Sequence, residues 1–184
     1  MVLRAETDLK AEDDLKLLKE QVFAQMLLLG YAEETISELG EITLGFLRRD
    51  ATQRHGVTRF HPGIDLKGEL GPKNIRRVDL HREILAEDWR DYGAYVLYHE
   101  YCHCLGYPGH GRDFRAFERL WGDDHSRKKG RQFTEFLRQR NAVWNWICPT
   151  CKAVHARRKR SNGRYKCRKC DIILLDVEKS NLAQ

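Results

Sequence analysis

The chain has 184 residues, of which 41% are hydrophobic and 33% are charged. This length and apolar content allow one core of moderate size with a small appended module, which excludes two full domains. The net charge of +6 is concentrated at one end: residues 148–184 carry 10 Lys and Arg against 3 Asp and Glu, which leaves −1 for residues 1–147. A basic appendage on a near-neutral body indicates a polyanion partner, nucleic acid first, with a solubilising tail as the alternative.

No stretch of the sequence predicts a membrane span or a secretion signal. The longest apolar run, around residues 26–29, is far too short to cross a bilayer, and residues 1–10 include acidic residues where a leader would be basic and then apolar. We therefore expect no membrane partner. We expect a protein of the cytoplasm, associated with the nucleoid, or of the nucleus, and not a secreted one.

The first fifty residues predict two helices. Apolar residues recur at helical spacing over residues 8–29, and Gly30 follows them as a stop signal. A second amphipathic helix is expected over about 33–49, although Gly40 and Gly45 weaken it. We interpret residues 1–50 as an N-terminal helical segment that serves as scaffold.

The next segment changes to short β-like runs. Residues 56–60 and 75–80 are separated by a Gly- and Pro-rich stretch, and the second run alternates apolar and charged residues imperfectly, as an exposed or edge strand would. A helix is then expected over about 89–105, a second one that stops at Gly122, and a short one over 133–140. The expected fold class is α+β, with helices packed on a short sheet.

Residues 99–103 read His-Glu-x-x-His and lie inside the helix expected at 89–105. Residues four apart share a helix face, so His99 and His103 can both ligate one Zn²⁺. Glu100 would then act as general base on a zinc-bound water, whose pKa falls to about 7. This division of labour predicts a zinc peptidase. The alternative is a pair of histidines packed in a helix interface beside an ordinary surface acid.

A catalytic zinc site takes three protein ligands and keeps a fourth position open, so a third ligand is needed downstream. His110 is the first candidate, because a Gly-rich turn at residues 106–111 can fold the chain back toward the helix. Glu118 on the following helix is the second candidate, and His125 is the third.

The metzincin pattern is excluded, because its third His would stand at position 109, which is Gly, and no Met follows the motif. Cys102 and Cys104 are interpreted as small apolar residues of a buried helix. Tyr107 and Arg112 are candidates for the donor that stabilises a developing oxyanion.

Four of the six cysteines form two C-x-x-C pairs near the C-terminus. Cys148 and Cys151 are separated by fifteen residues from Cys167 and Cys170, a spacing typical of a four-thiolate zinc ribbon. Four thiolates close a zinc ion against water and catalysis, so this second zinc would be structural.

The segment between the two pairs predicts a nucleic-acid contact. It places six cations and one aromatic ring around a Gly turn, which suits a hairpin that grips phosphates and stacks a base. A merely solvated hairpin is the alternative. The candidate residues are Arg157, Arg158, Lys159, Arg160, Arg164, Tyr165 and Lys166.

The sequence resembles the SprT-like metallopeptidases, the family that includes Spartan-type proteases of DNA–protein crosslinks. The resemblance covers roughly residues 50–175. It rests on the His99-Glu100-x-x-His103 motif, on His110-Gly111-x-x-Phe114, and on a ribbon with a basic hairpin and Tyr165-x-Cys167-x-x-Cys170.

The resemblance implies a small zincin-like α+β domain with an open active-site groove and a C-terminal zinc ribbon. By it, His99, His103 and His110 bind a catalytic zinc, Glu100 is the base, and the substrate is a protein attached to DNA. We divide the chain into residues 1–50, a metallopeptidase domain at 51–145, a ribbon at 146–176 and a tail at 177–184. The alternative function is a non-proteolytic, ribbon-based nucleic-acid-binding protein, for example in transcription.

Overall fold

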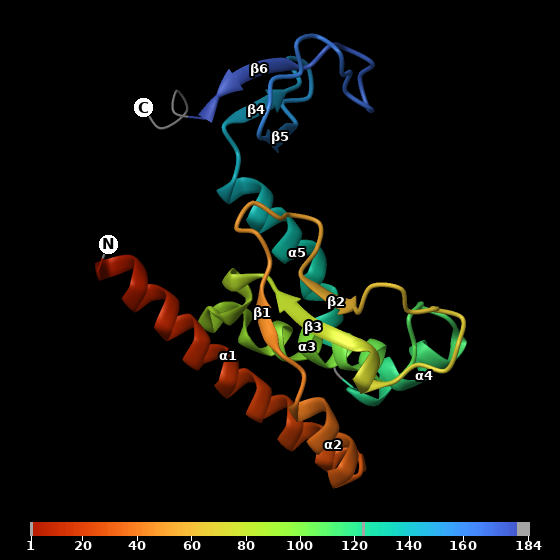
Figure 1. Ribbon diagram of the computed structural model, residues 1–184. Coiled ribbons are helices and arrows are strands. Elements are labelled where there is room, and N and C mark those ends of the chain that lie inside the picture. Colours follow the sequence, from red (N-terminus) through yellow and green to blue (C-terminus); the bar gives the residue numbers. More distant parts are fainter. Residues whose placement is uncertain (1, 123, 180–184) are drawn as a thin grey trace. The chain divides into compact units, whose positions relative to one another are not determined.

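The computed structural model describes residues 2–122 and 124–179 (Figure 1). Within these residues the fold is α+β, with five α-helices and two separate three-stranded sheets. The chain divides into two compact units, Met1–Gly130 and Arg131–Gln184. The expected fold class is therefore confirmed, and each unit is described by itself below.

The first unit opens with helix α1 (Val2–Leu28), which buries one stripe of apolar side chains. Leu15, Leu18, Val22 and Met26 recur every three or four residues and are almost inaccessible to solvent. This is the spacing at which a helix buries one face against a core. The ring of Phe23 stacks on a tyrosine of the central helix α3 (Arg90–Cys104), so α1 packs directly against the helix that carries the histidine motif.

Helix α2 (Glu33–Gly40) is shorter than expected. The prediction of a helix over 33–49 is wrong beyond Gly40, because the chain leaves the helix there and forms strand β1 (Leu44–Phe46). β1 gains a parallel partner in β3 (Ile75–Leu80), with Leu44 opposite Val78. Hydrogen bonding to a distant strand thus overrides a helical pattern that its glycines had already weakened.

The first sheet has the order β1-β3-β2, and β2 (Gly56–Phe60) runs antiparallel to β3. Both β2 and β3 cover the residues expected from the sequence. The prediction that β3 is an exposed or edge strand is wrong, because it lies in the centre of the sheet with Val78 and Leu80 fully buried. The sequence pattern misled because the charged residues Arg77 and Asp79 of β3 pair with each other on one face of the sheet instead of marking an exposed strand.

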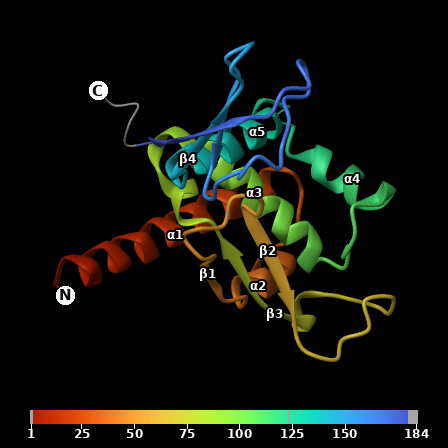
Figure 2. The same cartoon turned by 90° about the horizontal axis from the view of Figure 1, so that it is seen from above.

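Three short 3₁₀ turns, Pro72–Asn74, Arg82–Leu85 and Glu87–Trp89, flank β3 and lead the chain into helix α3. Helix α3 packs on the inner face of the sheet, and twelve of its fifteen residues are buried. Helix α4 (Arg112–Leu120) packs against α3, and α5 (Asp124–Arg140) comes after it in the chain (Figure 2). Since its faces are almost all buried, the side chains of α3 are held in fixed positions.

The second unit is built on the antiparallel sheet β5-β4-β6. Its strands are β4 (Trp144–Ile147), β5 (Val154–Arg157) and β6 (Leu175–Glu178). The buried cluster beside this sheet is very small and consists of Cys148, Cys167 and Leu174; Phe133 and Leu137 of α5 are also fully buried. Across both units, none of the helices that the structure describes has the length and apolar character required to span a membrane.

Candidate metal centres

The three histidines expected from the sequence lie together. His99 and His103 project from one face of α3, and His110 approaches them from the turn between α3 and α4. One ring nitrogen from each lies within 4.8 Å of the others, and the Nε2 atoms of His110 and His99 are 3.1 Å apart. Gly106 permits the turn, because its φ is +101° and a Cβ there would lie 2.7 Å from the carbonyl oxygen of Leu70.

Two of the imidazoles are oriented by hydrogen bonds at Nδ1. The Nδ1 of His99 lies 2.9 Å from a carboxylate oxygen of Glu118, and the Nδ1 of His103 lies 2.6 Å from the carbonyl oxygen of Tyr107. Both acceptors fix the tautomer with the proton on Nδ1, which leaves Nε2 with its lone pair turned to the cluster. Burial lowers the pKa of both rings, that of His103 to about 4, which favours the neutral form that metals bind.

Glu118, the second candidate for the third ligand, does not belong to the ligand cluster among the described residues. Its Oε1 accepts hydrogen bonds from His99 and from the hydroxyl of Tyr95, which is 2.7 Å away. The guanidinium of Arg115 lies 3.5 Å from its Oε2. Glu118 is thus placed to orient a ligand and not to be one. The side chain of His125, the third candidate, lies outside the described residues.

Phe114 forms an apolar wall beside the histidines. The centroid of its ring lies 4.9 Å from His99, 4.5 Å from His103 and 4.8 Å from His110. It is the first buried residue of α4, so the helix that supplies Glu118 also supplies this wall. An apolar neighbour limits water on one side of the cluster and strengthens electrostatic interactions there.

Glu100 is buried on α3 against strand β2. Its carboxylate accepts a hydrogen bond from the hydroxyl of Thr58, 2.8 Å away, and that hydroxyl also lies 3.1 Å from the carbonyl oxygen of Glu100. Burial raises the pKa of Glu100 to about 7 in spite of the Thr58 hydrogen bond. The strand approaches this closely only because residue 56 is Gly, where a Cβ would lie 2.6 Å from the carboxylate. Glu100 is not in the ligand cluster, as the prediction of a base requires.

The donor set of the histidine cluster fits zinc. Three neutral imidazoles with ordered Nδ1 partners are the ligand type and the outer shell that catalytic zinc sites use. Cys102 and Cys104 lie buried on the same helix outside the cluster, and burial raises the pKa of Cys102 to about 12, which keeps it a neutral thiol. The oxyanion role of Tyr107 and Arg112 stays a prediction: the Tyr107 ring packs at a tilt against Phe117, and Arg112 is exposed.

The four cysteines of the two C-x-x-C pairs form the second cluster, with their sulfurs within 4.8 Å of one another. The two turns repeat one geometry. Lys152 and Asp171 each have positive φ, and each donates its backbone N–H to the carbonyl of the cysteine four residues earlier. The N–H of Cys151 also points to the sulfur of Cys148 and lowers the pKa of that thiol. This set fits a closed, structural zinc site.

The basic segment of the second unit surrounds a cavity of about 700 Å³. Six of the seven predicted nucleic-acid residues line it; the seventh, Lys166, pairs with Asp171 at 3.1 Å. The sequence interpretation included Tyr165 but missed the two tryptophans of β4. Trp146 stacks on Tyr165 at 4.6 Å between centroids, and Arg160 lies over Trp144. The alternation of Trp144 and Trp146 in a strand was the signal that could have found them. The lining residues are Trp146, Arg157, Arg158, Lys159, Arg160, Ser161, Asn162, Arg164 and Tyr165.

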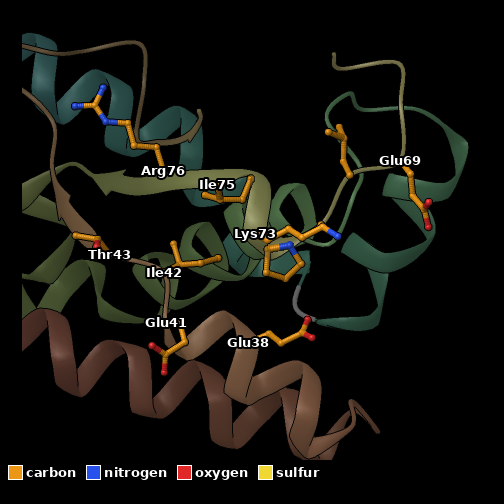
Figure 3. Close-up of a pocket in the computed structure, with 11 residues that line it drawn as sticks. Glu38, Glu41, Ile42, Thr43, Glu69, Lys73, Ile75 and Arg76 are labelled. Atoms are coloured by element: carbon orange, nitrogen blue, oxygen red, sulfur yellow. The ribbon is translucent and has the colours of Figure 1, made fainter. Parts of the chain in front are cut away.

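A further cavity, of about 650 Å³, lies between α2 and the start of β3 in the first unit (Figure 3). Ile42 and Ile75 supply apolar lining, and Glu38, Glu41 and Glu69 are acidic residues around it. None of the three histidines lines it. The charged lining is mixed, because a lysine and an arginine also belong to it.

Comparison with known proteins returned no similarity: no family model, no curated protein and no solved structure matches the chain. The class of the protein therefore rests on its own fold and sites. It is an α+β protein with a zincin-like cluster of three histidines on and beside a helix, and with a four-cysteine cluster like that of a zinc ribbon.

Proposed function

We propose that this protein is a zinc-dependent endopeptidase that cleaves proteins bound or crosslinked to DNA. The observation that carries the proposal is the histidine cluster, with Nδ1 partners on His99 and His103 and with a buried carboxylate one residue after the first ligand. The resemblance of these residues to the SprT-like motifs supports the same function.

The residues divide the chemistry of peptide hydrolysis. Zinc held by His99, His103 and His110 would supply Lewis acidity, lowering the pKa of water and polarising the peptide carbonyl. Glu100 would accept the proton of the attacking water and return it to the leaving amine. Thr58 holds the carboxylate in place, and Phe114 keeps one side of the cluster apolar.

The basic surface of the second unit supports the DNA part of the proposal. Its cavity combines guanidinium groups with the exposed ring of Tyr165, which stacks on Trp146, and this combination can bind phosphates and stack a base. The four-cysteine cluster would hold this surface in shape, since cysteines of the cluster make up most of the small buried group beside the sheet.

The test joins metal content with cleavage of a DNA-bound protein. We expect about two zinc ions per chain and cleavage that a chelator abolishes. Glu100→Gln should keep both zinc ions and lose cleavage, because the amide cannot accept the proton. The matched control is Glu20→Gln on the exposed side of α1. A zinc-loaded Glu100→Gln variant that cleaves as fast as the wild type would refute the assignment.

The second candidate function is a nucleic-acid-binding protein, for example in transcription, whose working part is the ribbon. The cations and aromatics that line the ribbon cavity favour it. It predicts loss of DNA binding when Arg157, Arg158, Lys159 and Arg160 are changed to Ala, and no proteolysis by the wild type on any DNA-bound substrate.

A further inference from the structure

Residues 1–147 are nearly neutral as a whole, but positive and negative charges are concentrated in different segments of this part of the chain. Residues 44–82, which contain the first sheet, carry 9 Lys and Arg against 4 Asp and Glu, a net charge of +5. Residues 1–43, which contain α1 and α2, carry 4 against 10, or −6. The sheet segment is therefore basic in its own right, apart from the ribbon.

Some of this positive charge lies on the outer face of the sheet. The inner face packs on α3: Val78 is buried there, and Thr58 opposite it bonds Glu100. Strand residues alternate between faces, so Arg59 and its partner Arg77 point outward. Figure 1 shows α3 behind the sheet and no helix of the first unit in front of β2 and β3.

Two of the outward arginines share one carboxylate. Asp79 is 4% exposed, and it pairs with Arg59 and with Arg77, whose Nη2 is 2.5 Å from its Oδ1. Gly45 on β1 leaves the space for Arg77, since a Cβ there would overlap that nitrogen. The shared carboxylate fixes both guanidinium groups but neutralises only one charge, and the side chains remain 45% and 36% exposed.

A third arginine joins them through a β-bulge. Residues 59 and 60 pair with 77 and 75, so Arg76 is the extra residue of β3. A bulge redirects a side chain, and Figure 3 shows Arg76 extending to the side of β3 away from Ile42. Arg76 is exposed, and no ion pair or hydrogen bond of its side chain is found in the part of the chain that the structure describes.

We propose that Arg59, Arg76 and Arg77, the arginine face, bind the phosphate backbone of DNA as a second contact, separate from the ribbon. Guanidinium groups match phosphate oxygens in pairs, and Asp79 holds two of them in place before binding, which lowers the entropy lost on association. Asp79 is the only carboxylate that pairs with these guanidinium groups in the described part of the chain, although Glu38, Glu41 and Glu69 line the cavity that Arg76 borders and Glu12 and Glu41 line one that Arg77 borders. Because Thr58 and Arg59 are consecutive, the DNA contact and Glu100 lie on opposite faces of β2. The inference rests on the proposed function.

The test is the salt dependence of duplex DNA binding by the zinc-loaded full chain. Each phosphate contact contributes about 0.9 to the slope of log K against log salt, or roughly a tenfold loss of affinity at 0.1 M salt when it is removed. We expect Arg76→Gln to lower the slope by about 0.9 and Arg59→Gln with Arg76→Gln by about 1.8. Lys16→Gln on α1 and Lys67→Gln before β3 are matched controls that should leave it unchanged.

If the Arg59 variant unfolds, Arg76→Gln alone still tests the proposal, because Arg76 takes part in no described ion pair. Zinc content and thermal melting show whether each variant is folded. If the wild type binds DNA and neither variant changes the slope of log K against log salt, the arginine face is overturned and the proposed function stands. No DNA binding by the wild type would overturn both. Variants that bind DNA normally but lose binding to polyglutamate, or self-association in sedimentation, would assign the face to an acidic protein or to the acidic helices of a second copy.

Discussion

At the scale of single residues, the two helix histidines have acceptors of different charge. His99 faces the carboxylate of Glu118, whereas His103 faces the neutral carbonyl of Tyr107. A carboxylate acceptor makes the imidazole a more basic ligand than a carbonyl does. Glu118 also accepts from Tyr95, so its position is fixed from two sides. Of the two helix histidines, His99 therefore has the hydrogen-bond acceptor that supports metal binding more strongly.

Glu118→Gln should weaken zinc binding at the histidine cluster while the protein stays folded. The amide keeps the shape of the side chain but loses the charge that supports His99, and loss of such a partner typically costs 10- to 100-fold in metal affinity or activity. Competition with a chelator of known affinity measures the change. Glu135→Gln, an exposed acid on α5, is the control. Equal zinc affinity in all three proteins would show that Glu118 does not support the metal.

The residues of the histidine cluster could be predicted from the sequence. Helix geometry places His99 and His103 on one face, and the Gly-rich turn indicates that the chain can fold back and bring His110 to that face. The role of Glu118 could not be predicted. A carboxylate that binds a metal and a carboxylate that orients a histidine ligand have the same sequence signal, and only the position of α4 separates the two. Thr58 was missed for a similar reason, since its contact with Glu100 joins residues 42 apart in the chain.

At the scale of elements, β2 approaches α3 more closely than a side chain at residue 56 allows. Gly56→Ala would put a Cβ 2.6 Å from Glu100 and 2.9 Å from Val96. Overpacking of this kind costs about 1–3 kcal/mol. We expect a lower free energy of unfolding by chemical denaturation. Gly71→Ala, where the structure has open space and an extended φ, is the control and should change it little. Equal losses in both variants would contradict the contact.

The junction between β2 and α3 also predicts a pH dependence. His55 precedes β2; its Nδ1 lies 2.6 Å from the hydroxyl of Tyr92, and burial, followed by the nearby His81, lowers its pKa from 6.5 to about 4. Between these values the unfolded chain binds more protons, so the stability contributed by neutral His55 is present above pH 6.5 and is lost as pH falls to about 4.

His55→Gln should therefore flatten the fall in unfolding free energy between pH 6.5 and 4, relative to the wild type. The measurement is chemical denaturation at several pH values in the presence of zinc. His155→Gln on β5, in the second unit, is the control. A pH profile that is the same with and without His55 would exclude this contribution.

The elements that were predicted correctly have strong local signals. β2 and β3 are separated by a Gly- and Pro-rich segment, and α3 is a long run without glycine after Gly93. β1 was missed because three residues carry almost no periodic signal, and its partner is 34 residues away in the register. β3 was interpreted as an exposed or edge strand because charged residues alternate with its apolar ones. In the structure Arg77 and Asp79 pair with each other, so these charges are compatible with a central strand.

At the scale of the whole molecule, the two units are stabilised in different ways. The first has a continuous apolar core from α1, the sheet and α3, to which the three histidines contribute little. In the second, the cluster beside the sheet contains two buried cysteines and Leu174, with Cys170 packed against it. Removal of metal should therefore have unequal effects, because a unit that lacks an apolar core depends on its metal to fold.

This difference can be tested with a thiol-reactive dye, which counts the cysteine thiols that react quickly. Six cysteines are present, of which Cys102 and Cys104 lie buried in α3 with raised pKa values, and the other four form the ribbon cluster. With zinc bound we expect slow reaction of all six. A chelator should release four fast-reacting thiols, while the remaining two react only in denaturant and far-UV circular dichroism keeps its helical signal. Cys102→Ala with Cys104→Ala should leave the fast count at four. Six fast thiols on chelation would instead mean that the first unit also requires its metal to remain folded.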